Sequence, residues 1–559
     1  MTYEQNYRLW LDRADESLQA ELKSMGKNPD AIEDAFYRDL AFGTGGLRGV
    51  IGAGTNRMNL HTVARASQGL ADYVNARFVP EERRIAVSYD SRIMSTEFAR
   101  VAASVFAANG IRVHIYSRLM PTPCLSWAVR SLHCAAGVMI TASHNPAEYN
   151  GYKVYGPDGC QITTEAAKAI LEAIEAIDMF NGPRRMDFDR GLEAGLIRWI
   201  GEDVLDAYLE AVKAQSLLGD APADRSARIV YTPLNGTGLE PVTRALRECG
   251  YRNVTVVAEQ EQPDGHFPTC PYPNPEIQEA MALGLEYARR LDADLLLATD
   301  PDCDRCGIAV KTEDGYRLLT GNETGMLLLD YICERRKALG NMPEAPVMVK
   351  TIVTTDMAQR IAEKHGVETV NVLTGFKYIG ETIGRLEARG EAERYIFGFE
   401  ESYGYLTGSY VRDKDGVNAA LMICEMFAYY RAQGVGLWER LEQLYVEYGY
   451  CLNALHSYQF EGSNGLAHMR NTMAALRSGI DSLGGRRVEK MLDYAQGIDG
   501  LPKSDVLKFM LSGNATVVVR PSGTEPKLKT YTSVHAQSRE QARIDEDALA
   551  TDIRKAIGL

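Results

Sequence analysis

The sequence predicts three α/β units followed by a smaller α+β unit. Three times in succession, apolar strand-like runs alternate with helical stretches, and in each unit one strand leads into a polar loop. The last part of the chain departs from this plan, because its helix precedes strand-like runs that favour an antiparallel sheet. The length of 559 residues suits about four domains. We expect their boundaries at 1–202, 203–313, 314–450 and 451–559.

Apolar periodicity supports the elements of the first unit. Helical spacing of apolar residues marks the N-terminal stretch to about Met25, and Asn181-Gly182-Pro183 breaks the chain near the end of the unit. The order strand, helix, strand favours a mainly parallel sheet. Strands are predicted at 85–90, 111–116, 135–140 and 151–155, and helices at 96–109 and 163–177.

The same plan recurs in the next two units and changes in the last. The second unit has predicted strands at 227–231, 254–257 and 293–298, with helices ending at 249 and spanning 276–291. The third has strands at 347–353, 369–372 and 395–397, with helices at 356–365 and 416–430. The fourth has a helix at 464–479 and strands at 506–511, 516–519 and 528–532.

Composition excludes several classes of function. A net charge of −14 and a pI near 5.3 argue against nucleic acid or an anionic membrane as a partner, although a local basic cluster could still bind an anionic substrate. No run is long enough to span a bilayer, and the polar start is no signal peptide. Ten cysteines lie mostly in apolar runs, so we expect a reduced, cytoplasmic protein. Cys303 and Cys306 form a C-x-x-C without a second pair at zinc spacing.

Ser143 is a candidate nucleophile. It lies in Thr141-Ala142-Ser143-His144-Asn145-Pro146, directly after the buried strand at 135–140, and open α/β sheets place ligands at such strand ends. Pro146 fixes the exit from the turn. The alternative is an ordinary Ser/Asn/Pro turn. We expect this turn at the surface, so that substitution of Ser143 leaves the fold intact.

Asp300, Asp302 and Asp304 are candidate metal ligands. Their i, i+2, i+4 spacing places them on one face of an extended chain, where three carboxylates repel unless a cation lies among them. Oxygen ligands of this kind suit Mg²⁺. An EF-hand is excluded, because Arg305 stands where that loop needs glycine and Lys311 where it needs glutamate. The alternative is an acidic solvated turn.

Three further segments offer groups for an anionic or polyhydroxylated ligand. The glycine-rich segment 43–49 presents Arg48 to an anion, or is only a structural turn. Lys377 beside Gly375 can bind a ligand or lie in solvent. Glu400, Glu401 and Ser402 could accept hydrogen bonds from sugar hydroxyls; alternatively Arg412 or Lys414 pairs with the two glutamates. A phosphate cradle, or a plain turn, is predicted at Arg520, Ser522, Gly523 and Thr524, with Lys527 and Lys529 beyond.

Together these motifs resemble one family. Thr-Ala-Ser-His-Asn-Pro, Asp-Pro-Asp-Cys-Asp-Arg, Gly-Phe-Glu-Glu-Ser-Tyr-Gly and Arg-Pro-Ser-Gly-Thr-Glu-Pro occur in the order found in the α-D-phosphohexomutase superfamily, the phosphoglucomutases and phosphomannomutases, and the likeness runs from Gly43 to Lys529. The resemblance implies three α/β domains with mixed sheets and a smaller C-terminal α+β domain around a central cleft.

The resemblance also implies roles for individual residues. Ser143 would carry a phosphoryl group, Asp300, Asp302 and Asp304 would bind Mg²⁺ together with a phosphoserine oxygen, and Lys153 would serve as acid and base. Arg48 and His144 would complete the catalytic set. The implied substrate-binding residues are Arg305, Thr374, Gly375, Lys377, Glu400, Ser402, Lys414, Arg520, Ser522, Gly523 and Thr524.

The implied activity interconverts glucose 1-phosphate and glucose 6-phosphate, with glucose 1,6-bisphosphate as activator and intermediate. The Glu-Glu-Ser segment at 400–402 resembles the glucose-preferring pattern. Alternatives within the class are a phosphomannomutase, a phosphopentomutase and a glucose-1,6-bisphosphate synthase. A non-catalytic sugar-phosphate sensor is the alternative from another class, but Ser143, Lys153 and the three aspartates argue against it. The expected partners are small-molecule sugar phosphates.

Overall fold

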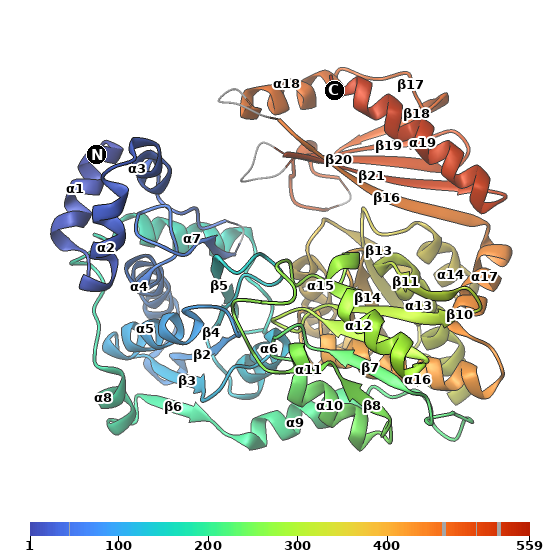
Figure 1. Cartoon of the computed structure of the whole chain (residues 1–559), viewed down its shortest axis with the longest axis horizontal. Coiled ribbons are helices and arrows are strands. Elements are labelled where there is room, and N and C mark those ends of the chain that lie inside the picture. Colours follow the sequence, from blue (N-terminus) through green and yellow to red (C-terminus); the bar gives the residue numbers. More distant parts are fainter. Residues whose placement is uncertain (44, 461–464, 499, 522–526, 559) are drawn as a thin grey trace.

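Four β-sheets follow one another along the chain, each packed with helices (Figure 1). The structure, a computed structural model, describes residues 1–43, 45–460, 465–498, 500–521 and 527–558. The first three sheets are mixed and the fourth is antiparallel. The predicted fold class of three α/β units and a final α+β unit is therefore confirmed.

The first sheet has the strand order β1-β5-β4-β2-β3-β6. Strands β4, β2, β3 and β6 run parallel, as the sequence predicts. Strand β5 runs antiparallel to β4, to which a short connection joins it, and the edge strand β1 pairs antiparallel with β5. The elements are α1 (Tyr3–Arg13), α2 (Glu16–Met25), α3 (Pro29–Phe36), β1 (Gly46–Val50), α4 (Leu60–Arg77), η1 (Pro80–Glu82), β2 (Arg84–Tyr89), α5 (Ser95–Ala108), β3 (Arg112–Tyr116), α6 (Thr122–Ser131), β4 (Ala136–Ile140), β5 (Tyr149–Tyr155), α7 (Thr164–Glu175), α8 (Phe188–Glu193) and β6 (Ile197–Ile200).

The second sheet, of order β11-β10-β9-β7-β8, repeats this plan. Strands β8, β7 and β9 are parallel, and β10 and β11 continue antiparallel. Strand β11 belongs to this sheet although it follows the expected domain boundary at 313; the four boundaries stay predictions. The elements are α9 (Glu202–Lys213), β7 (Ile229–Thr232), α10 (Leu239–Glu248), β8 (Val254–Val256), α11 (Ala258–Glu261), α12 (Gln278–Leu291), β9 (Leu295–Thr299), β10 (Cys306–Thr312) and β11 (Gly315–Leu319).

The third sheet, of order β13-β12-β14-β15, again ends in an antiparallel strand, β15. Its apolar helix α16 starts at an Asp415 cap and lies in the core, where Glu425 accepts hydrogen bonds from the Leu217 amide and the Tyr331 hydroxyl. The elements are α13 (Gly321–Leu339), β12 (Val347–Thr351), α14 (Met357–His365), β13 (Glu368–Val372), α15 (Phe376–Ala388), η2 (Ala392–Arg394), β14 (Tyr395–Glu400), β15 (Gly404–Leu406), α16 (Gly416–Ala432) and α17 (Leu437–Tyr448).

The fourth sheet, of order β16-β21-β20-β19-β18-β17, has its own hydrophobic core, with Phe509 and Leu549 at its centre. It lies against the third unit through an apolar contact that includes Ile352 and Tyr531 (Figure 1). The elements are β16 (Tyr450–Gln459), α18 (Gly465–Arg477), β17 (Ser482–Leu483), β18 (Arg486–Asp493), η3 (Tyr494–Gln496), β19 (Leu507–Leu511), β20 (Ala515–Pro521), β21 (Lys527–Ala536) and α19 (Arg539–Ala556).

The sequence predicts no membrane-spanning segment and reduced cysteines. Searched over the described residues, the helices include none both long and apolar enough to cross a membrane. All ten cysteines lie in the described residues and are free thiols, and Cys303 and Cys306 are both buried. The cytoplasmic location stays a prediction.

Candidate active site

Each of the first three sheets places a polar loop at the same topological position. In each sheet a parallel strand is followed by an antiparallel neighbour: β4 by β5, β9 by β10, and β14 by β15. The first of these loops carries Ser143, the second carries the three aspartates, and the third carries Ser402. Because all three loops leave the C-terminal ends of parallel strands, they lie where open α/β sheets bind ligands.

These loops meet at a cleft of about 730 Å³ that residues of all four units line. Asp300 and Asp302 are fully buried and contact the cleft residues Ser143 and Lys153. Ser522, Gly523 and Thr524 lie outside the described residues. The predicted site residues that line the cleft are Arg48, Ser143, His144, Lys153, Asp304, Arg305, Thr374, Gly375, Lys377, Glu400, Ser402, Lys414 and Arg520.

Ser143 reaches into the second unit. Its Oγ donates a hydrogen bond of 2.8 Å to Asp300 Oδ2 and lies 3.2 Å from His144 Nδ1. The expectation of a surface turn is wrong, because Ser143 is only 3% exposed and its hydroxyl contacts Asp300 of the second unit. Its φ of +55° is in the left-handed region, which is uncommon for residues other than glycine. A buried hydroxyl held in a strained turn is typical of functional sites.

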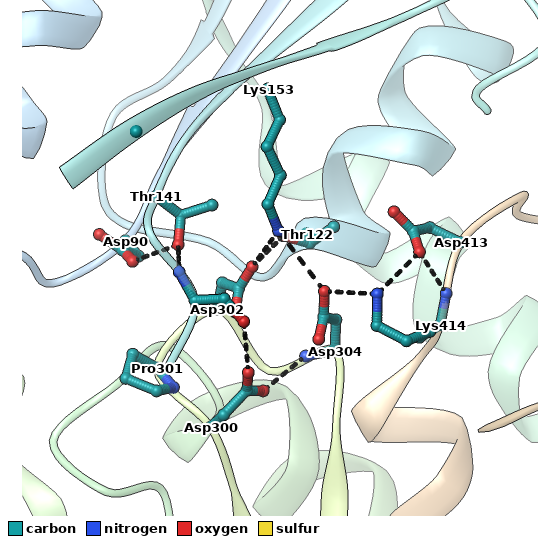
Figure 2. Close-up of polar contacts among 12 residues, drawn as sticks. Asp90, Thr122, Thr141, Lys153, Asp300, Pro301, Asp302, Asp304, Asp413 and Lys414 are labelled. Atoms are coloured by element: carbon teal, nitrogen blue, oxygen red, sulfur yellow. Dashed lines mark hydrogen bonds and ion pairs between the residues drawn. The ribbon is translucent and has the colours of Figure 1, made fainter. Parts of the chain in front are cut away.

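The three aspartates form a buried cluster between two lysines. Ligand atoms of Asp300, Asp302 and Asp304 lie within 4.8 Å of one another, and Figure 2 shows the carboxylates converging. Lys153 Nζ lies 2.8 Å from Asp302 Oδ2 and Lys414 Nζ lies 2.9 Å from Asp304 Oδ2. Burial and the two neighbouring carboxylates raise the pKa of Asp300 well above its usual range. Burial would also raise the pKa of Asp302, but the charge and hydrogen bond of Lys153 lower it below its usual value.

The cluster can hold a divalent cation. Asp302 Oδ1 and Asp304 Oδ1 are buried and have no hydrogen-bond partner among the described residues, so each keeps an oxygen for another ligand. Asp300 Oδ1 instead accepts from the amides of Asp304 and Arg305, at 3.1 and 3.0 Å, which curls the loop around the cluster. Unpaired buried carboxylate oxygens are costly, and a hard cation with oxygen ligands would satisfy them.

Cationic and imidazole groups surround Ser143. Arg48 lies on β1 rather than in the expected glycine loop, and its Nη1 donates 3.2 Å to Asn145 Oδ1. Burial, together with the charges of Arg305 and Arg48, lowers the pKa of His144 well below its usual range. His144 is therefore a neutral imidazole at neutral pH, while the cations beside it can face a phosphoryl group.

Glu400 and Glu401 accept hydrogen bonds from an amide and from hydroxyl groups, while Arg412, the expected ion-pair partner, lies beside another glutamate. Glu400 Oε1 accepts from the Gly375 amide at 2.9 Å, and Glu401 accepts from Thr351 and Thr354. Arg412 instead lies 2.7 Å from Glu387. Burial raises the pKa of Glu400 to about 7, although the charge of Lys414 acts against it.

Two residues beside Gly375 also suit a ligand. Thr374 Oγ1 is buried and has no hydrogen-bond partner among the described residues. Lys377 is the second residue of α15, and burial lowers the pKa of its side chain. Hydroxyl, carboxylate and ammonium groups at one wall of the cleft fit a polyhydroxylated ligand.

Two cations face the cleft from the fourth unit. Arg520 on β20 stands directly opposite Lys529 on β21, and both line the cleft. Burial, and then the charges of Arg520 and Lys527, lower the pKa of Lys529. Like charges opposite each other destabilise a sheet unless an anion lies between them. This end of the cleft therefore suits a phosphate.

Sequence reasoning missed several supporting residues. Thr122, the first residue of α6, donates through Oγ1 to Asp302 Oδ2 at 3.0 Å (Figure 2). Asp90 and Arg92 follow β2 and contact the Ser143 loop. The strand at 85–90 was predicted, so its C-terminal end was the signal that could have revealed them. Glu276, which pairs with Arg305, carried no such signal.

Family models match the chain in four consecutive parts. They are the phosphoglucomutase/phosphomannomutase α/β/α domains I, II and III, at residues 39–180, 206–315 and 320–448, and the C-terminal domain at 484–551. The chain belongs to the phosphoglucomutase/phosphomannomutase family. Membership agrees with the resemblance that the four motifs indicate, and places the chain in the α-D-phosphohexomutase superfamily.

This chain is similar to curated relatives and to solved structures along most of its length. It is 35% identical to a phosphoglucomutase of Staphylococcus saprophyticus over 546 residues, which cover 95% of this chain and 97% of that one. A phosphoglucomutase of Staphylococcus aureus strain USA300 is also 35% identical, over 94% and 95% of the two chains. The fold is similar to a phosphoglucomutase/phosphomannomutase family protein from Burkholderia thailandensis, with a TM-score of 0.68, 19% identity and coverage of 92% and 97%.

Proposed function

We propose that this protein is a phosphoglucomutase that interconverts glucose 1-phosphate and glucose 6-phosphate through a phosphoserine at Ser143. The observation that carries the proposal is the hydrogen bond from the Ser143 hydroxyl to Asp300 of a buried carboxylate cluster, at a cleft with cations opposite. Curated relatives at 35% identity that bear the name phosphoglucomutase support glucose as the sugar. A phosphomannomutase, a phosphopentomutase and a bisphosphate synthase remain outcomes of the test below.

The aspartate cluster fits Mg²⁺. The donors are three carboxylates, and two of their oxygens are buried without a hydrogen-bond partner among the described residues. Mg²⁺ prefers oxygen ligands and, when bound, neutralises charge on a transferring phosphoryl group. Asp300, Asp302 and Asp304 would hold it, with an oxygen of the Ser143 side chain completing the site.

The chain's own residues then divide the work of phosphoryl transfer. Such transfer requires in-line positioning and neutralisation of charge. Ser143 Oγ donates or accepts the phosphoryl group, and Arg48 and Arg305 balance its charge. Lys153, held 2.8 Å from Asp302, exchanges the proton of the reacting sugar hydroxyl. Neutral His144, 3.2 Å from Ser143 Oγ, orients that oxygen.

The opposite walls bind the sugar and its second phosphate. Glu400 and Ser402 hydrogen-bond the sugar hydroxyls, with Thr374, Gly375, Lys377 and Lys414 beside them. Arg520 and Lys529 bind the phosphate that does not react, together with Ser522, Gly523 and Thr524, which lie outside the described residues. A bisphosphate formed at Ser143 must turn end for end, so this wall has to accept either phosphate.

Phosphoryl loading and sugar preference test the proposal. The protein is incubated with glucose 1,6-bisphosphate, and its intact mass is followed before and after addition of glucose 1-phosphate. We expect one phosphoryl group to be gained and then lost. A coupled assay over the 1-phosphates of glucose, mannose, glucosamine and ribose should give the highest kcat/KM for glucose. Absence of loading would favour the non-catalytic sensor, and preference for another sugar would reassign the substrate.

Replacing Arg520 with alanine should weaken binding of the non-reacting phosphate. A charged hydrogen bond of this kind contributes roughly 1.5–3 kcal/mol, so kcat/KM for glucose 1-phosphate should fall by about one to two powers of ten. Most of the loss should appear in KM, because this phosphate is bound alike in ground and transition states. Steady-state kinetics measure the effect. Arg486→Ala, on the far side of the same sheet near Asp545, is the control. Unchanged KM and kcat/KM in Arg520→Ala would mean that this strand end binds no phosphate.

The raised pKa of Glu400, about 7, predicts a pH-dependent KM. Below pH 7 the carboxyl group is mostly protonated, and above it the carboxylate accepts hydrogen bonds from sugar hydroxyls more strongly. KM for glucose 1-phosphate should therefore fall by up to about tenfold between pH 6 and pH 8. The substrate phosphate also titrates, near pH 6, and this too changes KM with pH. Glu400→Gln is therefore the control, because it keeps the pH dependence of the phosphate and loses that of Glu400. Equal pH profiles for the two proteins would contradict the assignment.

A further inference from the structure

The backbone of Ser143 is held on both sides. Its φ of +55° is an unfavourable conformation for a residue with a Cβ, so other contacts must maintain it. The Ser143 amide donates 2.7 Å to Thr141 Oγ1, and the Ser143 carbonyl accepts 2.5 Å from Arg92 Nη2. These two contacts fix the peptide groups before and after the reacting residue.

The two partners of Ser143 meet at one buried ion pair. Thr141 Oγ1 donates 2.6 Å to Asp90 Oδ2, as Figure 2 shows, and Arg92 Nε lies 3.5 Å from the same oxygen. The side chains of Asp90 and Arg92 are both 0% exposed. The segment that follows β2 is therefore linked to the Ser143 amide through Thr141. It also bonds directly to the Ser143 carbonyl, through Arg92.

Both members of the pair make further hydrogen bonds, those of Arg92 to the Ser143 loop and those of Asp90 to the segment that follows β2. Arg92 also donates to the carbonyls of Asn145, Pro146 and Tyr149, the last two at 2.8 and 3.0 Å. Asp90 Oδ1 accepts from the Arg92 amide at 3.0 Å and from Ser95 Oγ at 2.8 Å. Buried charges of this kind persist only when they are paired and hydrogen-bonded, and here most of the bonds go to the loop from 141 to 149.

We infer that Asp90, Arg92 and Thr141 form a clamp of positioning residues that fixes the direction of Ser143 Oγ throughout the catalytic cycle. In the free hydroxyl state, Oγ is also oriented by its own bond to Asp300. That bond needs the hydroxyl proton, which is absent when Ser143 carries a phosphoryl group. The backbone contacts involve no atom that reacts, so they are present in both states. This inference rests on the proposed function.

Thr141→Val tests the clamp with little change of shape. Valine matches threonine in size but lacks the hydroxyl that joins Asp90 to the Ser143 amide. We expect kcat to fall about ten- to a hundredfold while KM for glucose 1-phosphate changes by less than about threefold, because only the reacting oxygen is misplaced. Thr141→Ser keeps the hydroxyl and should restore most of the rate. Arg92→Lys keeps the charge but loses the fork of donors, so it should show the same split between kcat and KM.

Ser95→Ala is the matched control. It removes the hydrogen bond to Asp90 Oδ1 and one from Asn150 Nδ2, but neither of these bonds involves Thr141 or the Ser143 backbone. We expect its kcat to stay within about threefold of the wild-type value even where its thermal midpoint falls as far as that of Thr141→Val. The clamp is refuted if Thr141→Val also stays within threefold, or if the two variants lose rate in proportion to stability.

Hydrogen exchange separates this inference from the proposed function. In the protein without substrate, amides of the peptide covering 141–147 should exchange faster in Thr141→Val than in Ser95→Ala and the wild type. Equal exchange in the three proteins would overturn the clamp even if the enzyme is active. A wild-type protein that shows no mutase activity would overturn the proposed function, and the exchange comparison would still decide whether the clamp holds the loop.

Discussion

Ser143→Ala is expected to abolish mutase turnover, with kcat lower by about ten-thousandfold or more. The physical reason is that alanine has no oxygen to carry the phosphoryl group, and loss of a nucleophile is among the costliest single changes in enzymes. The fold should remain, because alanine has the same Cβ at φ +55° and the backbone contacts of residue 143 do not involve the hydroxyl. Loss of the bond to Asp300 should lower the free energy of unfolding by only about 1 kcal/mol.

Two measurements check this expectation. Intact mass after incubation with glucose 1,6-bisphosphate should show no phosphoryl gain in Ser143→Ala, and circular dichroism should show an unchanged spectrum. Ser402→Ala is the control, because Ser402 is the other serine that lines the cleft among the described residues. That variant should still load a phosphoryl group. If Ser143→Ala loads and Ser402→Ala does not, the nucleophile has been assigned to the wrong loop.

Asp302→Asn should produce the second-largest effect, a fall in rate of more than about a hundredfold together with a need for more Mg²⁺. Lys153 and Lys414 contact the carboxylate cluster, so cations already offset part of its negative charge. The substitution removes the Asp302 carboxylate, which is a proposed cation ligand and also holds Lys153 at 2.8 Å. The variant should bind the cation more weakly, and Lys153, the proposed proton carrier, should be less firmly positioned.

Activity measured against Mg²⁺ concentration checks the second prediction. Asp292→Asn is the matched control, since Asp292 lies just before β9 in the same unit and pairs with Lys311 and Arg228 at the surface. Its φ of +50° is one that asparagine also adopts readily. We expect the control to reproduce the wild-type curve. A wild-type curve for Asp302→Asn as well would refute the metal assignment.

The sequence located the elements whose signal is local. Strand β4 is an unbroken apolar run of five buried residues, as expected for a strand covered on both faces, and its prediction differed by one residue at the start. Strand β1 was missed, because Gly46 and Gly49 indicate a loop. It is a strand through its pairing with β5, where a Cβ at Gly46 would lie 2.0 Å from the Tyr152 carbonyl. This pairing is a tertiary contact, which the local sequence does not reveal.

Some features of the candidate site were likewise predictable from local sequence, and others depend on the tertiary structure. Ser143, the aspartates and Glu400 were predictable, because each lies at or just beyond the C-terminal end of a strand that the apolar pattern reveals. The burial of Ser143 was not, because a polar turn is covered only when the second unit packs against the first. Nor was the link between Asp90 and Thr141, which are distant in sequence and meet only when β2 and β4 pair in the sheet.

The aspartate cluster also connects three units of the fold. Asp300 contacts Ser143, Asp302 contacts Thr122 and Lys153, and Asp304 contacts Lys414, so the first and third units are both joined to the second at these carboxylates. A cation bound there favours the docked units over the unfolded chain, in proportion to its affinity for the folded state. We therefore expect cation concentration to affect thermal stability as well as rate, and a substitution in this loop to change both at once.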